Sequence, residues 1–453
     1  YWLMDAFNEN SNEQQAQQPM GCLHRFSKTI KVVIIGLLIL LLMIPMFMIE
    51  NLISERGRTQ EEAIDEVSEK WSLAQTITGP YLNLQYPVVT ENNGEKKVSI
   101  KDLILFPDEL MVNGQLKTEI LKRSIYEVNV YQSELTLKGS FSSEELKKSR
   151  IDMEQLQFDR AAICLNLTDM RGISEQISIT LGDSVYIFEP GMDNRGIANT
   201  GVHAIANLSE LKQNKKLPYE IKIKLKGSQS LNFIPLGKTT RVDLKANWNT
   251  PSFTGNYLPN NRNITEKEFS AQWQVLNLNR NYSQVMVDYN TSNIKDIENS
   301  SFGVNFKIPV EQYQQSMRSA KYAILIILLT FGVIFFTEIM NKTRIHALQY
   351  LLVGLALCLF YSLLLSFSEH IGFNPAYLLS SALTIILVGG YMFGITKKKK
   401  PSLIMSGLLG ILYLYIFVLI QLETFALLAG SLGLLIILAM VMYFSKKIDW
   451  FNE

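Results

Sequence analysis

Five long runs without a charged side chain occupy the C-terminal part of this sequence. About twenty helical residues cross the ~30 Å hydrocarbon core of a bilayer, because an α-helix rises 1.5 Å per residue. A sixth run, Val32–Ile49, stands alone near the N-terminus. The pattern predicts an N-terminal anchor, a large intervening segment and a five-helix membrane bundle. The five runs of the bundle are Tyr322–Thr337, Ala347–Ser368, Ala376–Thr396, Leu403–Leu422 and Thr424–Ser445.

The charges beside these runs predict the topology. Three basic residues precede the first run, and its exit at Met48-Ile49-Glu50 lacks the small residues of a signal-peptide cleavage site. An uncleaved signal anchor is therefore expected. Of the links between the later runs, two are basic and two carry Glu369 with His370 or Glu423. The positive-inside rule then puts both termini and the basic links in the cytoplasm. The basic positions are Arg25, Lys28, Lys31, Lys342, Arg344, Lys397–Lys400, Lys446 and Lys447.

These signals divide the chain into five parts. The first residues are rich in Asn and Gln and predict a disordered tail. The segment after the anchor is long enough for one or two domains with hydrophobic cores. The predicted parts are a cytoplasmic tail (1–29), a transmembrane anchor (30–50), an extracytoplasmic domain (51–318), the helical bundle (319–445) and a cytoplasmic tail (446–453).

The extracytoplasmic segment is predicted to be rich in β-strands. It opens with a helix, because Thr59-Gln-Glu-Glu62 has the form of a capping box and apolar residues follow at helical spacing. From Tyr81 onward apolar and polar residues alternate, which is typical of half-buried antiparallel strands. A second capping box, Ser142-Ser-Glu-Glu145, predicts a helix that runs to Gln157. At the far end, a helix from Pro309 is expected to continue unbroken into Tyr322. We predict an α+β membrane protein with six transmembrane helices and a β-sandwich-like domain.

A short internal echo suggests two similar β-units. Leu135-Thr-Leu-Lys-Gly-Ser140 resembles Ile223-Lys-Leu-Lys-Gly-Ser228. Two stacked units of similar build would give this spacing, and chance similarity between strand residues is the alternative.

Composition excludes several function classes. The 43 basic and 42 acidic residues nearly cancel, whereas bulk binding of nucleic acid needs a basic excess. Three cysteines are too few for a disulfide framework. The sequence holds no metal-binding His or Cys pair, no nucleophile elbow and no phosphate-binding loop. His203 is expected to be a surface or internally hydrogen-bonded histidine. No cofactor, no metal and no enzymatic activity are therefore expected.

A series of sequence blocks spread from the first helix to the last run carries a family resemblance. They include Gln75-Thr-Ile-Thr-Gly-Pro80, Phe253-Thr-Gly-Asn-Tyr-Leu-Pro259, Phe269-Ser-Ala-Gln-Trp273, Leu278-Asn-Arg280, His346-Ala-Leu-Gln-Tyr350 and Ser366–Phe373. In these blocks the chain resembles the CreD family of bacterial inner-membrane proteins. It departs from the family at Ala347, where members often have proline. The resemblance implies an envelope-stress protein, often encoded beside a two-component regulatory system, with no established chemical reaction.

Four polar residues in or beside the predicted spans are candidate functional groups, because an unpaired charge in lipid is costly. Glu338 would pair with Lys342 at the cytoplasmic surface or, alternatively, lie buried in the bundle. Glu369 and His370 would form a polar turn, dock the outer domain, or relay protons or bind a cation. Glu423 would mark the tip of a tight hairpin or belong to an ion path.

One outer loop combines aromatic rings with amides. Within Trp248–Pro259, the side chains of Trp248, Phe253, Asn256 and Tyr257 would bind a sugar or peptide by stacking and hydrogen bonding. A packed Ω-loop would use the same residues, and this alternative is favoured.

Two functions compete on these observations. The preferred one is an inner-membrane protein of envelope integrity that acts through binding of its periplasmic domain to envelope proteins or glycans. The alternative is a proton- or ion-coupled transporter that uses Glu338, Glu369, His370 and Glu423. Five spans after the domain do not divide into two repeats, which favours the first. The lipid bilayer is the expected partner in both.

Overall fold

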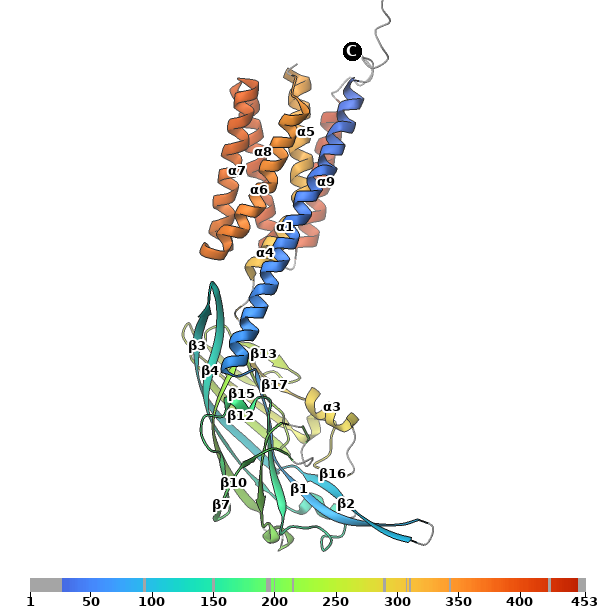
Figure 1. Cartoon of the computed structure of the whole chain (residues 1–453), viewed down its shortest axis with the longest axis vertical. Helices are drawn as coiled ribbons and strands as arrows, with labels where there is room; N and C mark the ends of the chain where they lie inside the picture. Colours follow the sequence, from blue (N-terminus) through green and yellow to red (C-terminus); the bar gives the residue numbers. More distant parts are fainter. Residues whose placement is uncertain are drawn as a thin grey trace, which may run out of the picture. The chain divides into compact units, whose positions relative to one another are not determined.

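The computed structural model describes residues 27–92, 95–148, 151–192, 197–198, 200–213, 216–287, 291–306, 308, 311–341, 344–422 and 425–446. The chain divides into two compact units. The first combines Tyr1–Arg58 with Val310–Glu453 and contains the apolar helices. The second, Thr59–Pro309, is rich in β-strands (Figure 1). Both are described separately below.

The helical unit contains most of α1 and six further described helices. Within the described residues, five helices are long and apolar enough to cross a membrane. The last helix, α9, is similarly apolar, and its part with described side chains, Leu428–Tyr443, is shorter. The described helices are α1 (Ser27–Trp71), α4 (Glu311–Ala320), α5 (Ala323–Asn341), α6 (Ala347–Ile371), α7 (Phe373–Thr396), α8 (Lys399–Gln421) and α9 (Ala426–Ser445).

The first helix is one continuous element, although the sequence predicts an anchor followed by a separate helix at Thr59. α1 runs from Ser27 to Trp71 and contains Pro45. Its polar half is rich in Glu, which favours helix, and Glu66 pairs with Lys70 one turn later at 2.6 Å. The predicted capping box at Thr59 is therefore wrong, because no chain reversal interrupts the helix there.

The predicted unbroken helix from Pro309 into Tyr322 is also wrong. α4 ends at Ala320 and α5 begins at Ala323. Between them the amide of Tyr322 donates to the carbonyl of Ser319 at 3.0 Å, and Leu325 donates to Tyr322 at 3.1 Å. These three-residue hydrogen bonds tighten the chain into a turn before the apolar helix.

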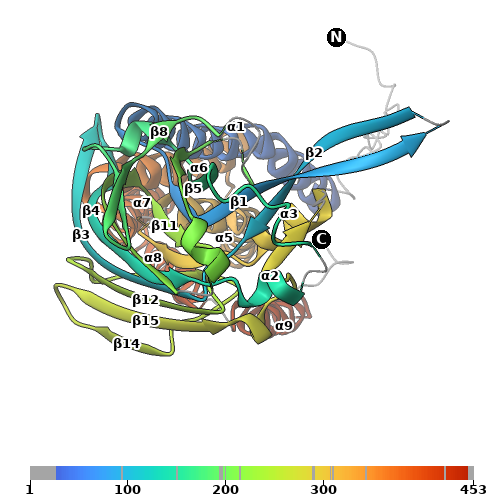
Figure 2. The ribbon, with the colours of Figure 1, turned by 90° about the horizontal axis from the view of Figure 1, so that it is seen from below.

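Two sheets build the β-rich unit. One follows the order β13-β17-β11-β1-β5-β9-β8, with β2 and β16 attached, and the other the order β14-β15-β12-β3-β4-β10-β6-β7. Figure 2 shows β12, β15 and β14 side by side in this order. The strands are β1 (Gln75–Asn92), β2 (Glu95–Leu105), β3 (Glu109–Arg123), β4 (Tyr126–Phe141), β5 (Ala161–Leu167), β6 (Ser178–Leu181), β7 (Ser184–Ile187), β8 (Glu189–Pro190), β9 (Val202–Ala206), β10 (Leu217–Ser228), β11 (Ser230–Phe233), β12 (Thr239–Ala246), β13 (Ser252–Gly255), β14 (Asn261–Ile264), β15 (Phe269–Leu276), β16 (Val285–Val287) and β17 (Phe302–Asn305).

Most strand pairs are antiparallel, as the alternation predicts, but two are parallel. β1 pairs with β11 in parallel, and β3 pairs with β12 in parallel. Parallel neighbours need long crossover connections. Here residues 93–229 separate the first pair and residues 124–238 the second, so the late strands return beside the early ones.

The core of the β-rich unit draws residues from both sheets. Along β10 and β12 every second side chain is buried, in agreement with the alternation of the sequence. Buried residues of the first sheet, such as Leu82 and Phe302, belong to the same cluster as Leu137 and Ile221 of the second. The structure thus confirms an α+β membrane protein with a β-rich, sandwich-like domain.

The echoed segments lie side by side. β4 and β10 are antiparallel neighbours, with Leu135 opposite Ile223. They therefore belong to one sheet rather than to two stacked units. The helix predicted to reach Gln157 is shorter than expected, since α2 covers Glu144–Lys148 and turns occupy residues 153–156.

Arg280 is a partly buried arginine in this unit. Its guanidinium donates to the carbonyls of Leu236 at 3.0 Å and Tyr282 at 3.2 Å, and lies 4.3 Å from the centre of the Tyr282 ring. Burial lowers the pKa of Arg280. Within the described chain no carboxylate pairs with it, so backbone carbonyls and the ring compensate its charge.

Candidate functional site

Three polar clusters join α1 to other elements, and each cluster lies within one of the two units. Two lie in the helical unit, around Glu338 and Glu369, and the third lies in the β-rich unit around Asp169. The first two contain residues that the sequence singles out. The third was missed.

Glu338 is buried in the helical unit. Its side chain is 11% exposed and pairs with the Lys31 ammonium of α1. The same carboxylate accepts hydrogen bonds from the amide of Ile345 at 3.2 Å and the hydroxyl of Tyr350 at 3.1 Å. Lys31 also donates to the carbonyl of Ile345 at 3.1 Å. The position agrees with the buried alternative. The pairing with Lys342 concerns a residue outside those described.

Glu369 receives contacts from two other helices. The hydroxyl of Tyr313 in α4 donates to its carboxylate at 2.9 Å, and the Nε of Arg56 in α1 lies 3.8 Å from the same oxygen. The Glu369 side chain is 11% exposed, although Arg56 is half-exposed. This carboxylate of α6 thus joins α1 and α4 within one unit.

His370 does not share this environment. It lies in the last turn of α6 and is exposed. The sequence predicts that Glu369 and His370 lie in one turn between two spans, but α6 continues to Ile371. Adjacent residues of a helix point in different directions, so the two side chains face different surroundings. Glu423, the fourth predicted polar residue, lies outside the described residues.

The aromatic loop packs on the core of the β-rich unit. Phe253 meets the ring of Trp273 edge to face at 5.6 Å, and Trp248 meets Phe306 at 6.5 Å. Asn256 donates to the carbonyl of Asn299 at 2.6 Å, and Tyr257 donates to that of Asn279 at 2.8 Å. These contacts are those of the packed-loop alternative. Binding of a sugar or peptide by Trp248, Phe253, Asn256 and Tyr257 stays a prediction.

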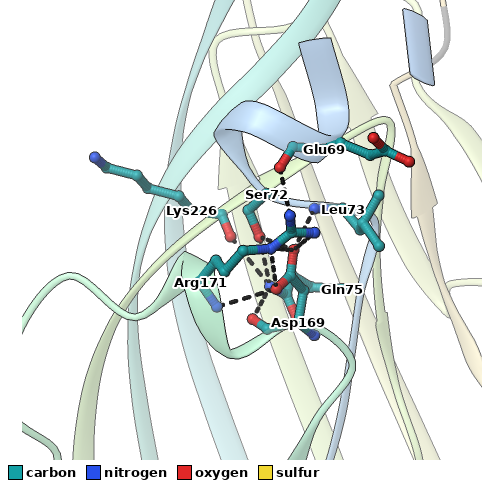
Figure 3. A network of polar contacts seen from close by, with 7 residues as sticks. All are labelled: Glu69, Ser72, Leu73, Gln75, Asp169, Arg171 and Lys226. Atoms are coloured by element: carbon teal, nitrogen blue, oxygen red, sulfur yellow. Dashed lines mark hydrogen bonds and ion pairs between the residues drawn. The ribbon is translucent and has the colours of Figure 1, made fainter. Parts of the chain in front are cut away.

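Asp169 centres the third cluster, where α1 ends and β1 begins (Figure 3). Its buried carboxylate accepts from the amide of Leu73 at 2.9 Å, the hydroxyl of Ser72 at 3.3 Å and the guanidinium of Arg171 at 3.0 Å. Arg171 donates in turn to the carbonyl of Glu69 at 2.6 Å. Because Glu69 is in the last turn of α1, this bond satisfies a carbonyl at the helix end.

Gln75 completes the cluster on the strand side. Its amide nitrogen donates to the carbonyl of Asp169 at 2.8 Å and to Ser72 at 2.9 Å, and its amide oxygen accepts from the backbone N–H of Asp169 at 3.2 Å. Gln75 also reaches the carbonyl of Lys226 at 3.3 Å. The start of β1, the segment after β5 and strand β10 are thereby joined through one side chain (Figure 3).

The pKa of Asp169 reflects this arrangement. Burial on its own raises the pKa of the carboxyl, but the hydrogen bonds from Arg171 and the amide of Leu73 outweigh it and lower the pKa to about 2. Asp169 is therefore charged at neutral pH. A sequence signal existed, since Asp169 follows a mostly apolar strand and caps a short 3-10 helix, but its partners Ser72 and Leu73 are 97 and 96 residues away.

The described side chains contain no group of three or more His, Cys, Asp and Glu arranged to hold an ion. His203 is buried in β9, with its Nδ1 at 2.7 Å from the carbonyl of Gly191. This is the hydrogen-bonded alternative given above.

Comparison with known proteins identifies the family of the chain. The family described as "Inner membrane protein CreD" matches residues 27–451. The inner membrane protein CreD of Escherichia coli (strain K12) is 32% identical over 420 residues, which are 91% of this chain and 91% of that protein. The matched range covers residues of both units. The chain is therefore a multi-pass inner-membrane protein and belongs to the CreD family.

Proposed function

We propose that this chain maintains or monitors the cell envelope, and that its β-rich unit binds envelope proteins or glycans on the periplasmic side. In this proposal both chain termini are cytoplasmic, as the basic links predict. The role is one of interaction rather than catalysis.

The contacts of Glu369 carry the proposal. The chain passes between its two units through α1, which continues to Trp71, and through the segment before α4. Glu369 accepts a hydrogen bond from Tyr313 of α4 and pairs with Arg56 of α1. A binding event that shifts either connection would therefore change contacts at the same carboxylate.

The same contacts weigh against the transporter. An ion path needs acidic groups that can exchange partners or protons along a water-filled route. Glu338 is instead held by three groups, and Glu369 by two, from other parts of the helical unit. Such contacts are suited to holding the helices of this unit together.

Crosslinking in intact cells tests the proposal. A membrane-permeant crosslinker, followed by purification of the full chain and peptide mass spectrometry, should attach envelope proteins or glycans to peptides of Thr59–Pro309. A Glu369→Gln variant serves in a parallel flux assay in liposomes, with Glu189→Gln, at an exposed strand position, as its control. Crosslinks confined to the helical unit, together with ion flux that Glu369→Gln abolishes, would refute binding and establish transport.

A further inference from the structure

An apolar groove lies among α5, α8 and α9 in the helical unit. Its volume is about 340 Å³. Each helix contributes one stripe of side chains spaced three or four residues apart. The groove is lined by Leu328, Leu329, Gly332, Val333 and Phe336 of α5, by Leu408, Ile411, Leu412 and Tyr415 of α8, and by Gly433, Ile436, Ile437, Met440 and Val441 of α9.

The lining has no polar side-chain group that is free to bind a ligand. Its one polar side-chain group, the hydroxyl of Tyr415, donates to the carbonyl of Ala429 at 2.9 Å. Water does not occupy cavities without polar partners. An empty groove would leave its lining without packing contacts on one side, so a hydrocarbon occupant is favoured.

Two glycines shape the groove. A side-chain carbon at Gly332 would meet no atom within 4 Å, so this position leaves open space on α5. At Gly433 the same carbon would lie 1.8 Å from the hydroxyl of Tyr415. Glycine therefore permits the close approach of α8 and α9 at one end, while the wider part stays unfilled.

The groove lies at the depth of lipid tails. From Leu328 to Phe336 it extends about 12 Å along α5, and it begins about 8 Å from the start of that helix, at 1.5 Å per residue. Rim residues Ile411 and Ile436 are 68% and 58% exposed, so the groove opens to the side of the helices. In a membrane this opening faces hydrocarbon rather than head groups or water.

We propose that the groove binds one acyl chain of a membrane phospholipid. The acyl chain fills the space beside Gly332 and packs on the stripes of the three helices. This site is separate from the polar clusters and does not depend on the proposed envelope binding.

Photolabelling tests the site. The full chain is reconstituted in nanodiscs with a phospholipid that carries a diazirine in the middle of one acyl chain. After irradiation, peptides that contain Phe336 or Met440 should be labelled at least about fivefold more than the peptide around Ile386, an exposed apolar residue of α7. Equal labelling would reduce the groove to ordinary lipid contact and overturn the proposal.

A filling variant gives the second test. Gly332→Leu should occupy the groove and reduce its labelling to the level at Ile386, whereas the matched control Gly390→Leu on α7, which also meets no atom within 4 Å, should leave it unchanged. Unchanged labelling in Gly332→Leu would contradict the proposal. Crosslinks between two copies through α9 in place of lipid would also overturn it, by showing that a second chain covers the groove. The labelling ratio of the wild-type protein, groove peptides against the peptide around Ile386, tests the proposal even if Gly332→Leu does not fold.

Discussion

Replacing Asp169 with Asn should destabilise the β-rich unit at the junction of α1 and β1. The carboxylate accepts from two side chains and two backbone amides. The neutral amide of Asn keeps one acceptor but turns an NH₂ group toward donors. Arg171 would also lose its charged partner. The change preserves size, so packing effects are small.

The expected magnitude follows from the pKa. The hydrogen bonds from Arg171 and Leu73 outweigh burial and lower the pKa of Asp169 from 3.8 to about 2. Each pKa unit corresponds to about 1.4 kcal/mol, so the charged form is stabilised by about 2 to 3 kcal/mol in the folded state. Loss of the charge should lower the free energy of unfolding by this amount. An unsatisfied donor would add to the loss.

The pH dependence has a definite sign. The folded pKa lies below the unfolded value, so the stabilisation is complete above about pH 5 and is lost as the pH falls from about 4 toward 2. The wild-type protein should lose about 2 to 3 kcal/mol from this group across that window. The Asp169→Asn variant should lack this component of the pH dependence.

Pulse proteolysis in urea measures the effect on the full chain in detergent. The unfolding midpoint of the β-rich unit is recorded at pH 7 and, with an acid-active protease, at several values down to about pH 2. Asp183→Asn, in the exposed turn after β6, is the matched control and should leave the midpoint unchanged. A loss below about 0.5 kcal/mol for Asp169→Asn at pH 7 would refute the assignment of stability to this cluster.

Three further predictions address other parts of the chain. Arg280→Met should lower the unfolding free energy of the β-rich unit by about 2 to 4 kcal/mol, because the Tyr282 carbonyl loses its Arg280 donor and the Leu236 carbonyl keeps only that of Gln284, and the urea midpoint reports it. Tyr313→Phe and Glu369→Gln should each accelerate tryptic cleavage at the turn between α4 and α5, and the double variant should add little, since the first removes and the second weakens the same charge-assisted hydrogen bond of about 1.5 to 3 kcal/mol. Cysteines at positions Asn93 and Lys398 should react with impermeant reagents from opposite sides of the membrane, and labelling from one side would disprove the topology.

Whether a segment forms a helix or a strand was largely predictable from the sequence, because each pattern of apolar residues corresponds to one kind of element. Uncharged runs of about twenty residues predict spans, and alternation along β10 and β12 predicts half-buried strands. Local boundary signals were less reliable. The motif at Thr59 satisfies the capping pattern, yet favourable helix formers on both sides let α1 continue.

The ion-pair and hydrogen-bond partners of the polar residues could not be predicted from their spacing in the sequence. Glu338 pairs with Lys31, which is 307 residues earlier, and Asp169 accepts from Leu73, which is 96 residues earlier. Such contacts depend on which elements become neighbours, and the sheet order with its two parallel pairs decides this in the β-rich unit. A residue close in sequence, such as His370 beside Glu369, shares no face with it once both are helical.

The polar contacts of α1 matter because its apolar contacts are few. Only 17% of its most apolar stretch is buried, along a narrow stripe that includes Leu42, which packs against Gly354 of α6. Lipid tails are as apolar as leucine, so burial of this stripe gives little net drive for helix association. Lys31 and Arg56 are 25 residues apart, which is about 38 Å along the helix and close to the thickness of a bilayer with its interfaces. One ion pair near each end of the stretch from Lys31 to Arg56 therefore restricts the sliding and rotation of α1. The apolar stripe alone does not prevent these movements.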